Sequence, residues 1–335
     1  PLLQESAHHR GPGGLGQSCQ FRQGFLAFDA HQHRAFPVVL HVTGPVPAHV
    51  FIADQDLNEE HRFIPKMVNQ IGKPYPEKIA VIGAGPAGIS CAYYLAVKGY
   101  PVTVFEKEKE LGGMLTLGIP SFRLDKDVVM AEIDILKKIG VEFKTGVEIG
   151  KDKTLDDLRA EGFKAFFLGI GASKGTKLGC PGDDMTGVFT GVDFLKAVNL
   201  GEKPAVGKTV AVIGGGNVAI DVARAAVRLG AKTTIVYRRD KDAMPAAADE
   251  VAEAVEEGVK FKFLSAPAEI LGEGKVAELK VEVMELKDGK PGGTGVFETM
   301  AVSAVISAIG QKIDMEGIDG VKAGDKGNVV VDKYL

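Results

Sequence analysis

The chain has 335 residues, enough for about two domains that each bury a core, so no disulfide or structural metal is needed to stabilise it. Its net charge of −4 and the lack of any apolar run of about 18 residues exclude the usual signatures of nucleic-acid binding and membrane insertion. The three cysteines lie far apart without a Cys-x-x-Cys motif, which predicts a cytoplasmic protein. Glycine is in excess, with 43 residues, so we expect bare backbone to be needed repeatedly.

Residues 1–50 differ in composition from everything that follows. They contain no Lys, Ile, Met, Tyr or Asn, and they hold six of the seven histidines. This break predicts a non-native segment, such as one translated from another reading frame, rather than a domain. Imidazoles can bind zinc, copper or nickel, but the histidine spacing matches no known metal cage, and we favour a weakly packed segment over a metal site.

Residues 51–77 have an ordinary composition and end close to a run that is typical of an extended linker, Gly72-Lys73-Pro74-Tyr75-Pro76. From Lys78 onward, apolar runs typical of buried strands alternate with segments of helical period. This alternation predicts an α/β fold in which parallel sheets are covered by helices on both faces.

The first nucleotide-binding motif is Gly83-Ala84-Gly85-Pro86-Ala87-Gly88, between a predicted strand at 78–82 and a predicted helix at 86–98. Its first glycine allows a tight turn, the second lets the backbone approach a pyrophosphate, and the third lets helix and strand pack closely. A second strand at 102–105 leads to Glu106, where a carboxylate would accept hydrogen bonds from ribose hydroxyls. Such a motif alone could merely cap a helix, but this context favours a dinucleotide site.

The same arrangement returns at Gly214-Gly215-Gly216-Asn217-Val218-Ala219, after a predicted strand at 209–213. Ala219 replaces the third glycine, and the following strand at 233–237 ends in Arg238-Arg239 instead of an acid. Guanidinium groups can pair with a 2′-phosphate that a carboxylate would repel, so this site should prefer NADP(H) to NAD(H). The alternative is a solvated arginine pair. Two such sites predict FAD and NADPH bound side by side, with hydride transfer between nicotinamide and flavin.

The most specific run in the chain is Leu111-Gly112-Gly113-Met114-Leu115-Thr116-Leu117-Gly118-Ile119-Pro120-Ser121-Phe122-Arg123-Leu124. With it, residues 73–335 resemble the flavin-containing NADPH oxidoreductases typified by the small subunit of glutamate synthase, a group that includes the flavin–NADPH portion of dihydropyrimidine dehydrogenase. The resemblance implies that Gly113, Met114 and Arg123 line the FAD site. It also implies that Ala308, Ile309 and Gly310 approach NADPH. Further matching runs are Gly169-Ile170-Gly171-Ala172 and Met244-Pro245-Ala246 with Glu250.

The resemblance implies two Rossmann-like domains, with an NADPH domain at 201–300 inserted into an FAD domain at 78–200 and 301–335. Relatives carry an N-terminal helical region whose clustered cysteines bind iron–sulfur centres, and residues 51–77 would be a linker or a remnant of it. Only Cys19 precedes the FAD domain, so the cluster ligands are absent from this chain. Relatives also continue beyond the last strand into an Ala-Gly-Asp segment that contacts the flavin. We therefore expect a chain cut at both ends, with weakened FAD retention.

The implied reaction needs no catalytic side chain and no metal, because the cofactors carry the hydride chemistry. We predict an NADPH-dependent flavin oxidoreductase subunit that passes electrons to an iron–sulfur or other redox partner, first of all the large subunit of glutamate synthase. Two alternatives stay open. One is a stand-alone flavin reductase for ferredoxin, quinone or disulfide acceptors, and the other is a non-catalytic fragment that binds NADP(H) but lacks stable FAD.

Three groups of reactive side chains have simpler interpretations than catalysis. The acids between Asp249 and Glu257 are typical of a solvated helix face. Cys91 is expected to pack against the sheet. Cys180 lies on a loop without the second cysteine that a redox pair requires.

Overall fold

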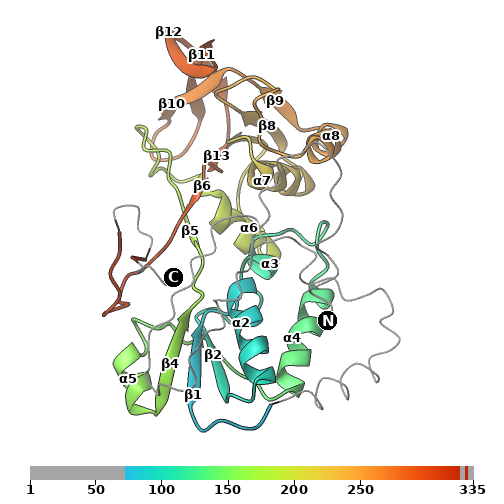
Figure 1. Cartoon of the computed structure of the whole chain (residues 1–335). Helices are drawn as coiled ribbons and strands as arrows, with labels where there is room; N and C mark the ends of the chain where they lie inside the picture. Colours follow the sequence, from blue (N-terminus) through green and yellow to red (C-terminus); the bar gives the residue numbers. More distant parts are fainter. Residues whose placement is uncertain (1–71, 325–328, 331–335) are drawn as a thin grey trace.

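The computed structural model describes residues 72–324 and 329–330. The predictions for residues 1–50, for most of 51–77 and for the end of the chain lie outside the described residues. The described part forms two lobes, each built on a parallel sheet, stacked along the long axis of the molecule (Figure 1). Within it, no helix combines the length and apolar character that crossing a bilayer requires.

The first lobe contains a four-stranded sheet in the order β3-β2-β1-β4. Its strands are β1 (Lys78–Ile82), β2 (Val102–Glu106), β3 (Glu142–Thr145) and β4 (Phe163–Leu168). One face packs against α2 (Pro86–Val97) and α4 (Lys126–Lys138), and the other against α5 (Leu155–Ala160), with the short helix α3 (Met114–Leu117) near the second lobe (Figure 1). β1, β2 and β4 are mostly buried on both faces, which explains their largely apolar sequences, whereas the edge strand β3 is partly exposed.

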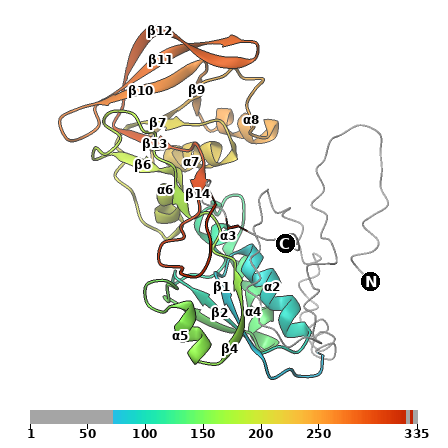
Figure 2. The same ribbon diagram turned by 60° about the vertical axis from the view of Figure 1, so that its left-hand side comes forward.

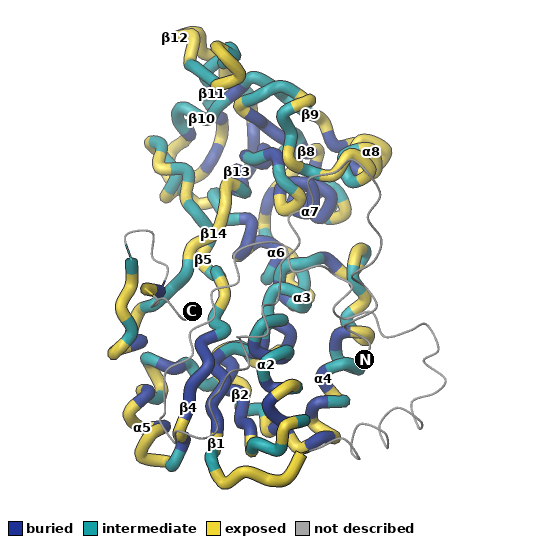
Figure 3. The backbone as a smooth tube through the Cα atoms, viewed as in Figure 1, coloured by how far each residue is buried: buried dark blue, intermediate teal, exposed yellow. Residues whose placement is uncertain are grey.

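The second lobe contains a five-stranded sheet in the order β6-β13-β7-β8-β9. Its strands are β6 (Val188–Thr190), β7 (Thr209–Ile213), β8 (Lys232–Val236), β9 (Lys260–Lys262) and β13 (Ala304–Ser307). The helices α6 (Gly191–Asn199), α7 (Asn217–Arg228) and α8 (Ala248–Glu256) pack with one face of this sheet. Figure 3 shows the burial that results, with β1, β4 and α7 almost wholly buried and the outer loops exposed.

An antiparallel sheet covers the other face of the second lobe. It consists of β10 (Ser265–Leu271), β11 (Glu278–Lys287) and β12 (Lys290–Ala301). Leu279 and Val281 of β11 are buried against the parallel sheet, while the intervening Lys280 is partly exposed. The prediction of helices on both faces is therefore wrong for this lobe. Apolar and polar residues alternate along β11, and a strand with this pattern buries its apolar face against the sheet.

The chain leaves the first lobe after β4 and returns to it after β13. The chain passes between the lobes through β5 (Lys174–Gly175) and β14 (Gln311–Lys312), which pair antiparallel (Figure 2). After the return, Ile318 and Val329 pack into the core of the first lobe. The second sheet takes in β6 and β13, outside the range 201–300 predicted for the NADPH domain, because β13 pairs with both β6 and β7.

Candidate functional site

The glycines of the first motif fall into two kinds. Gly83 has φ of +100°, and a Cβ there would lie 2.5 Å from the carbonyl oxygen of Gly169. A Cβ on Gly88 would lie 1.9 Å from the carbonyl oxygen of Gly83, so close packing within the protein requires both glycines. A Cβ on Gly85 would meet only the Cα of Gly113, at 3.9 Å. The space in front of Gly85 is the kind of cradle that a pyrophosphate needs at a helix N-terminus.

Gly112 and Gly113, from the run of residues 111–124, contact the first motif. Gly112 donates its N–H to the carbonyl oxygen of Ala84 at 3.0 Å. Gly113 has φ of +55°, and a Cβ on it would lie 2.7 Å from the Cα of Gly85. The structure thus brings Gly113, and Met114 at the start of α3, to the first motif, where the resemblance places FAD.

Glu106 lies buried at the carboxyl end of β2, beside the first motif. Its carboxylate accepts the N–H of Ala84 at 2.7 Å and the N–H of Glu108 at 2.9 Å. The acid therefore holds the turn that follows β1. Carboxylate oxygens can each accept more than one hydrogen bond, so a ribose contact is compatible with this geometry and stays a prediction.

The second motif repeats this division of roles. Gly214 has φ of +145°, and a Cβ there would lie 2.4 Å from the carbonyl oxygen of Ala308. A Cβ on Gly215 would lie 2.6 Å from the ring of Tyr237, whereas Gly216 has open space around the Cβ position. Gly216 is the N-cap of α7, so this open space lies at a helix N-terminus, where backbone amides are free.

Both motifs lie where strand connections run in opposite directions. β1 lies between β2 and β4, and β7 lies between β8 and β13. Gly169 donates its N–H to the carbonyl oxygen of Ile82, and Ala308 does the same to Ile213, both at 2.8 Å. Open parallel sheets bind ligands at the carboxyl ends of strands at such a point, so the two motifs occupy equivalent topological positions, here called the first and second crevices.

A cavity with a volume of about 530 Å³ lies at the second motif, in the second crevice. Five residues predicted for NADPH contribute to its lining: Gly216, Asn217, Val218, Ala308 and Gly310. The structure therefore brings the second motif and the return turn together, although they are about 90 residues apart in the sequence. Ile309, predicted with them, is 47% exposed on the same turn. Gly191, Val192 and Ser307 also line the cavity and were not predicted, because only strand pairing reveals that β6 and β13 end there.

The loop between β8 and α8 forms one wall of this cavity. Asn217 accepts the N–H of Ala247 at 3.0 Å through its side-chain oxygen, and Ala246 donates its N–H to the carbonyl oxygen of Gly215 at 3.1 Å. These bonds hold Pro245 in the lining. From the Met244-Pro245-Ala246 run of the resemblance, Pro245 thus lines the cavity.

The two arginines after β8 differ in their surroundings. Arg238 is exposed, whereas Arg239 is partly buried. The Nε atom of Arg239 is buried and has no hydrogen-bond partner among the described residues. A buried guanidinium donor without an acceptor is compatible with an anionic partner, and a contact of Arg239 with a 2′-phosphate stays a prediction. Neither arginine is among the residues that line the cavity.

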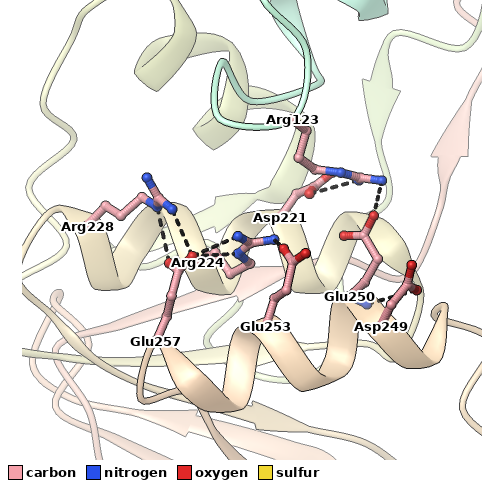
Figure 4. A network of polar contacts seen from close by, with 8 residues as sticks. All are labelled: Arg123, Asp221, Arg224, Arg228, Asp249, Glu250, Glu253 and Glu257. Carbon is pink, nitrogen blue, oxygen red and sulfur yellow. Dashed lines mark hydrogen bonds and ion pairs between the residues drawn. The ribbon is translucent and has the colours of Figure 1, made fainter.

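Arg123 lies against the second lobe. Its guanidinium binds Asp221 on α7 and Glu250 on α8 (Figure 4), and these are the contacts that the structure shows for it. Its assignment to the FAD site stays a prediction that these contacts do not support. Among the acids between Asp249 and Glu257, Asp249, Glu253 and Glu256 are exposed, as expected of a solvated face, whereas Glu250 and Glu257 are partly buried. Glu253 and Glu257 bind the guanidinium of Arg224.

The described cysteines are not activated. Burial raises the pKa of Cys91 to about 12, and burial, with Asp183 as the next cause, also raises the pKa of Cys180. Both are free thiols, and Cys19 lies outside the described residues. In the described part of the chain, no three His, Cys, Asp or Glu side chains gather in a way that could hold a metal ion.

Residues 77–335 match the family model of the pyridine nucleotide-disulphide oxidoreductases. The NADP(+)-dependent formate dehydrogenase subunit beta of Moorella thermoacetica is 40% identical over 271 residues, which cover 76% of this chain and 38% of that protein. The glutamate synthase [NADPH] small chain of Escherichia coli (strain K12) is 42% identical over 242 residues, which cover 68% of this chain and 50% of that protein. The chain thus spans half or less of these relatives' length.

Among solved structures, FprA from Mycobacterium tuberculosis in complex with NADPH superposes with a TM-score of 0.64 at 21% identity. The match covers 76% of this chain and 74% of FprA. At this identity the likeness shows the fold alone.

Proposed function

The chain belongs to the pyridine nucleotide-disulphide oxidoreductase family, and from that premise we propose that it is an electron-transfer subunit that oxidises NADPH through FAD and reduces a partner protein. FAD and NADP(H), predicted from the two motifs, are the cofactors of this family. The observation that carries the proposal is the pair of equivalent crevices, each with one motif glycine that faces open space.

The two crevices differ in charge, which supports a different cofactor in each. Glu106 at the end of β2 suits ribose hydroxyls and would repel a 2′-phosphate, so we assign the first crevice to FAD. Arg239 with its buried free donor suits the 2′-phosphate of NADPH in the second. When both are bound, reduced nicotinamide gives a hydride to the flavin, which leaves NADP⁺ and reduced flavin. The protein contributes amide donors at the starts of α2 and α7 and the relative position of its lobes.

We place the large subunit of glutamate synthase first among partners, because one relative at 42% identity is a glutamate synthase small chain. The relative named as a formate dehydrogenase subunit supports the broader class of redox complexes equally well. Iron–sulfur centres on a partner would carry the electrons onward, and the cytoplasmic location predicted from cysteine usage belongs to this proposal. A stand-alone flavin reductase and a non-catalytic NADP(H)-binding fragment remain the competing functions.

The visible spectrum of the purified protein, with and without added FAD, tests the proposal. We expect flavin absorption that NADPH bleaches faster than NADH does. A protein that binds NADPH but stays colourless after incubation with FAD would instead be the non-catalytic fragment. Pull-down with glutamate synthase large subunit, and with ferredoxin as the comparison, then separates the partner subunit from the stand-alone reductase.

A further inference from the structure

A short turn of the first lobe reaches across to the helices of the second. The turn follows α3, and Arg123 and Leu124 donate their N–H groups to the carbonyl oxygen of Pro120 at 3.0 and 3.1 Å. Its two outward side chains, Phe122 and Arg123, contact α7 and the residues that α7 pairs with. We call these two residues the clasp.

Arg123 makes the polar half of the clasp. One guanidinium nitrogen lies 2.9 and 2.8 Å from the two carboxylate oxygens of Asp221, and the other contacts Glu250. The side chain of Arg123 is 26% exposed, that of Asp221 only 7% and that of Glu250 17%. An ion pair desolvated to this degree holds its geometry better than a surface pair, and loss of one partner leaves a buried charge unpaired.

Phe122 makes the aromatic half. The guanidinium groups of Arg224 and Arg228 lie 4.5 and 4.1 Å from the centre of its ring. Both arginines are held by Glu257, at 2.7 Å each, and Arg224 also by Glu253 at 2.6 Å (Figure 4). Ion pairs within the second lobe therefore hold both of the guanidinium groups that contact the ring.

The clasp is rigidly attached to the first lobe. The Nζ of Lys126 on α4 donates to the carbonyl oxygens of Leu115, at 2.8 Å, and of Ile119. From the second lobe, Asn199 donates to the carbonyl oxygens of Leu117 and Ile119 at 2.9 and 3.2 Å. The segment that carries the clasp cannot shift without breaking bonds on both sides.

One end of this segment lies at the first motif, and the other contacts the helix that begins at the second motif. Its first residues, Gly112 and Gly113, close on the first motif, as described above. At its other end, Arg123 binds Asp221, which lies one helical turn after Asn217 at the start of α7. Segment 112–124 therefore connects the two nucleotide motifs physically.

We propose that Phe122 and Arg123 are positioning residues for hydride transfer, which fix α7 and its bound nicotinamide in a set relation to the first crevice. Hydride transfer requires donor and acceptor within about 3–3.5 Å, so a small displacement of one lobe lowers the rate without changing nucleotide affinity. The kinetic consequence rests on the proposed function, whereas the positioning of the lobes does not.

The structural arm of the test needs no bound cofactor. The three cysteines of the chain are replaced by serine or alanine, and spin labels are attached through Lys138→Cys on α4 and Lys232→Cys on β8, both exposed. The distance between the two labels, measured by double electron–electron resonance, should have one narrow distribution in this parent. The distribution should be broader or shifted after Arg123→Gln or Phe122→Ala. The matched control is Arg159→Gln, because Arg159 pairs with Asp156 and lies 5.2 Å from the Phe166 ring centre within one lobe. Distances unchanged in both folded clasp variants would overturn the inference.

The kinetic arm uses single-turnover reduction of the flavin by NADPH. Arg123→Gln should lower the limiting rate about 10- to 100-fold while the NADPH dissociation constant stays within about twofold, and Arg123→Lys should recover part of the rate. A loss of NADPH affinity with an unchanged limiting rate would contradict a positioning role. If the protein takes up no flavin, the proposed function fails, and the label distances alone decide whether the clasp positions the lobes.

Discussion

The guanidinium of Arg123 spans both carboxylate oxygens of Asp221, a residue 98 positions further along the chain. Arg123 ends a segment that begins over the first nucleotide motif, and Asp221 lies on the helix that begins at the second. The two motifs, which the sequence presents as separate sites, are therefore connected through contacts that include this ion pair.

The ion pair should depend on pH. Burial raises the pKa of Asp221 to about 6, with Arg123 opposing the shift and Glu250 adding to it; Arg224 and Lys126 are the other charges nearby. Because the folded pKa lies above the unfolded value of 3.8, the native state binds a proton between about pH 4 and 6 that the unfolded chain releases. The contribution of Asp221 to the free energy of unfolding therefore falls as pH rises through that window and is constant above it.

Asp221→Asn removes this titration. The difference in unfolding free energy between the parent protein and the variant should decrease by up to about 3 kcal/mol from about pH 4 to about pH 7, at about 1.4 kcal/mol per pKa unit. Urea titrations of both proteins across this range measure it. A difference that is independent of pH would mean that Asp221 titrates near its ordinary value.

Substitution by alanine should change the stability of the protein strongly at one glycine of the first motif and weakly at another. Gly88→Ala places a methyl group 1.9 Å from the carbonyl oxygen of Gly83 and should lower the free energy of unfolding by about 2 kcal/mol or more. Gly85 has φ of −75° and open space, so Gly85→Ala should change stability by less than about 1 kcal/mol. The same variant should weaken FAD binding about 10-fold, because its methyl group enters the pyrophosphate cradle.

Thermal or urea unfolding of the two variants, together with FAD titration, checks both statements. If Gly85→Ala bound FAD as the parent does, the first crevice would not be the pyrophosphate site.

The arginine pair should contribute unequally to nucleotide preference. Arg239→Ser should raise the NADPH dissociation constant about 10- to 100-fold, because it removes a buried charged donor. Arg238→Ser should have a smaller effect, since Arg238 is exposed. Titrations with NADPH and NADH compare them, and equal losses for the two nucleotides would argue against a 2′-phosphate contact.

Cys91 should resist thiol reagents in the native protein. With a pKa raised to about 12 by burial, its thiol is almost never ionised near neutral pH, and the thiolate is the reactive form. Mass spectrometry after brief iodoacetamide treatment should find Cys91 modified only once urea unfolds the protein. Rapid modification under native conditions would show that α2 opens readily.

Local patterns carry most of what the sequence predicted correctly. Each motif occupies six consecutive residues between a strand and a helix, and the observed elements begin or end within about one residue of the predicted ones, as in α2 and β8. Glycines that a tight turn requires, such as Gly83 and Gly214, can be identified from spacing, because their backbone conformation depends on adjacent residues.

Contacts between distant segments were decided by the tertiary structure alone. The sequence does not show that β13 pairs with β7, so Ser307 and Gly191 were missed as cavity residues. The resemblance in sequence places Arg123 at the flavin site. In the structure, its guanidinium binds Asp221 and Glu250, because the two lobes pack against each other there. Spacing along a chain determines which residues share a turn or a helix face, whereas partners about 100 residues apart meet only through the arrangement of whole sheets and lobes.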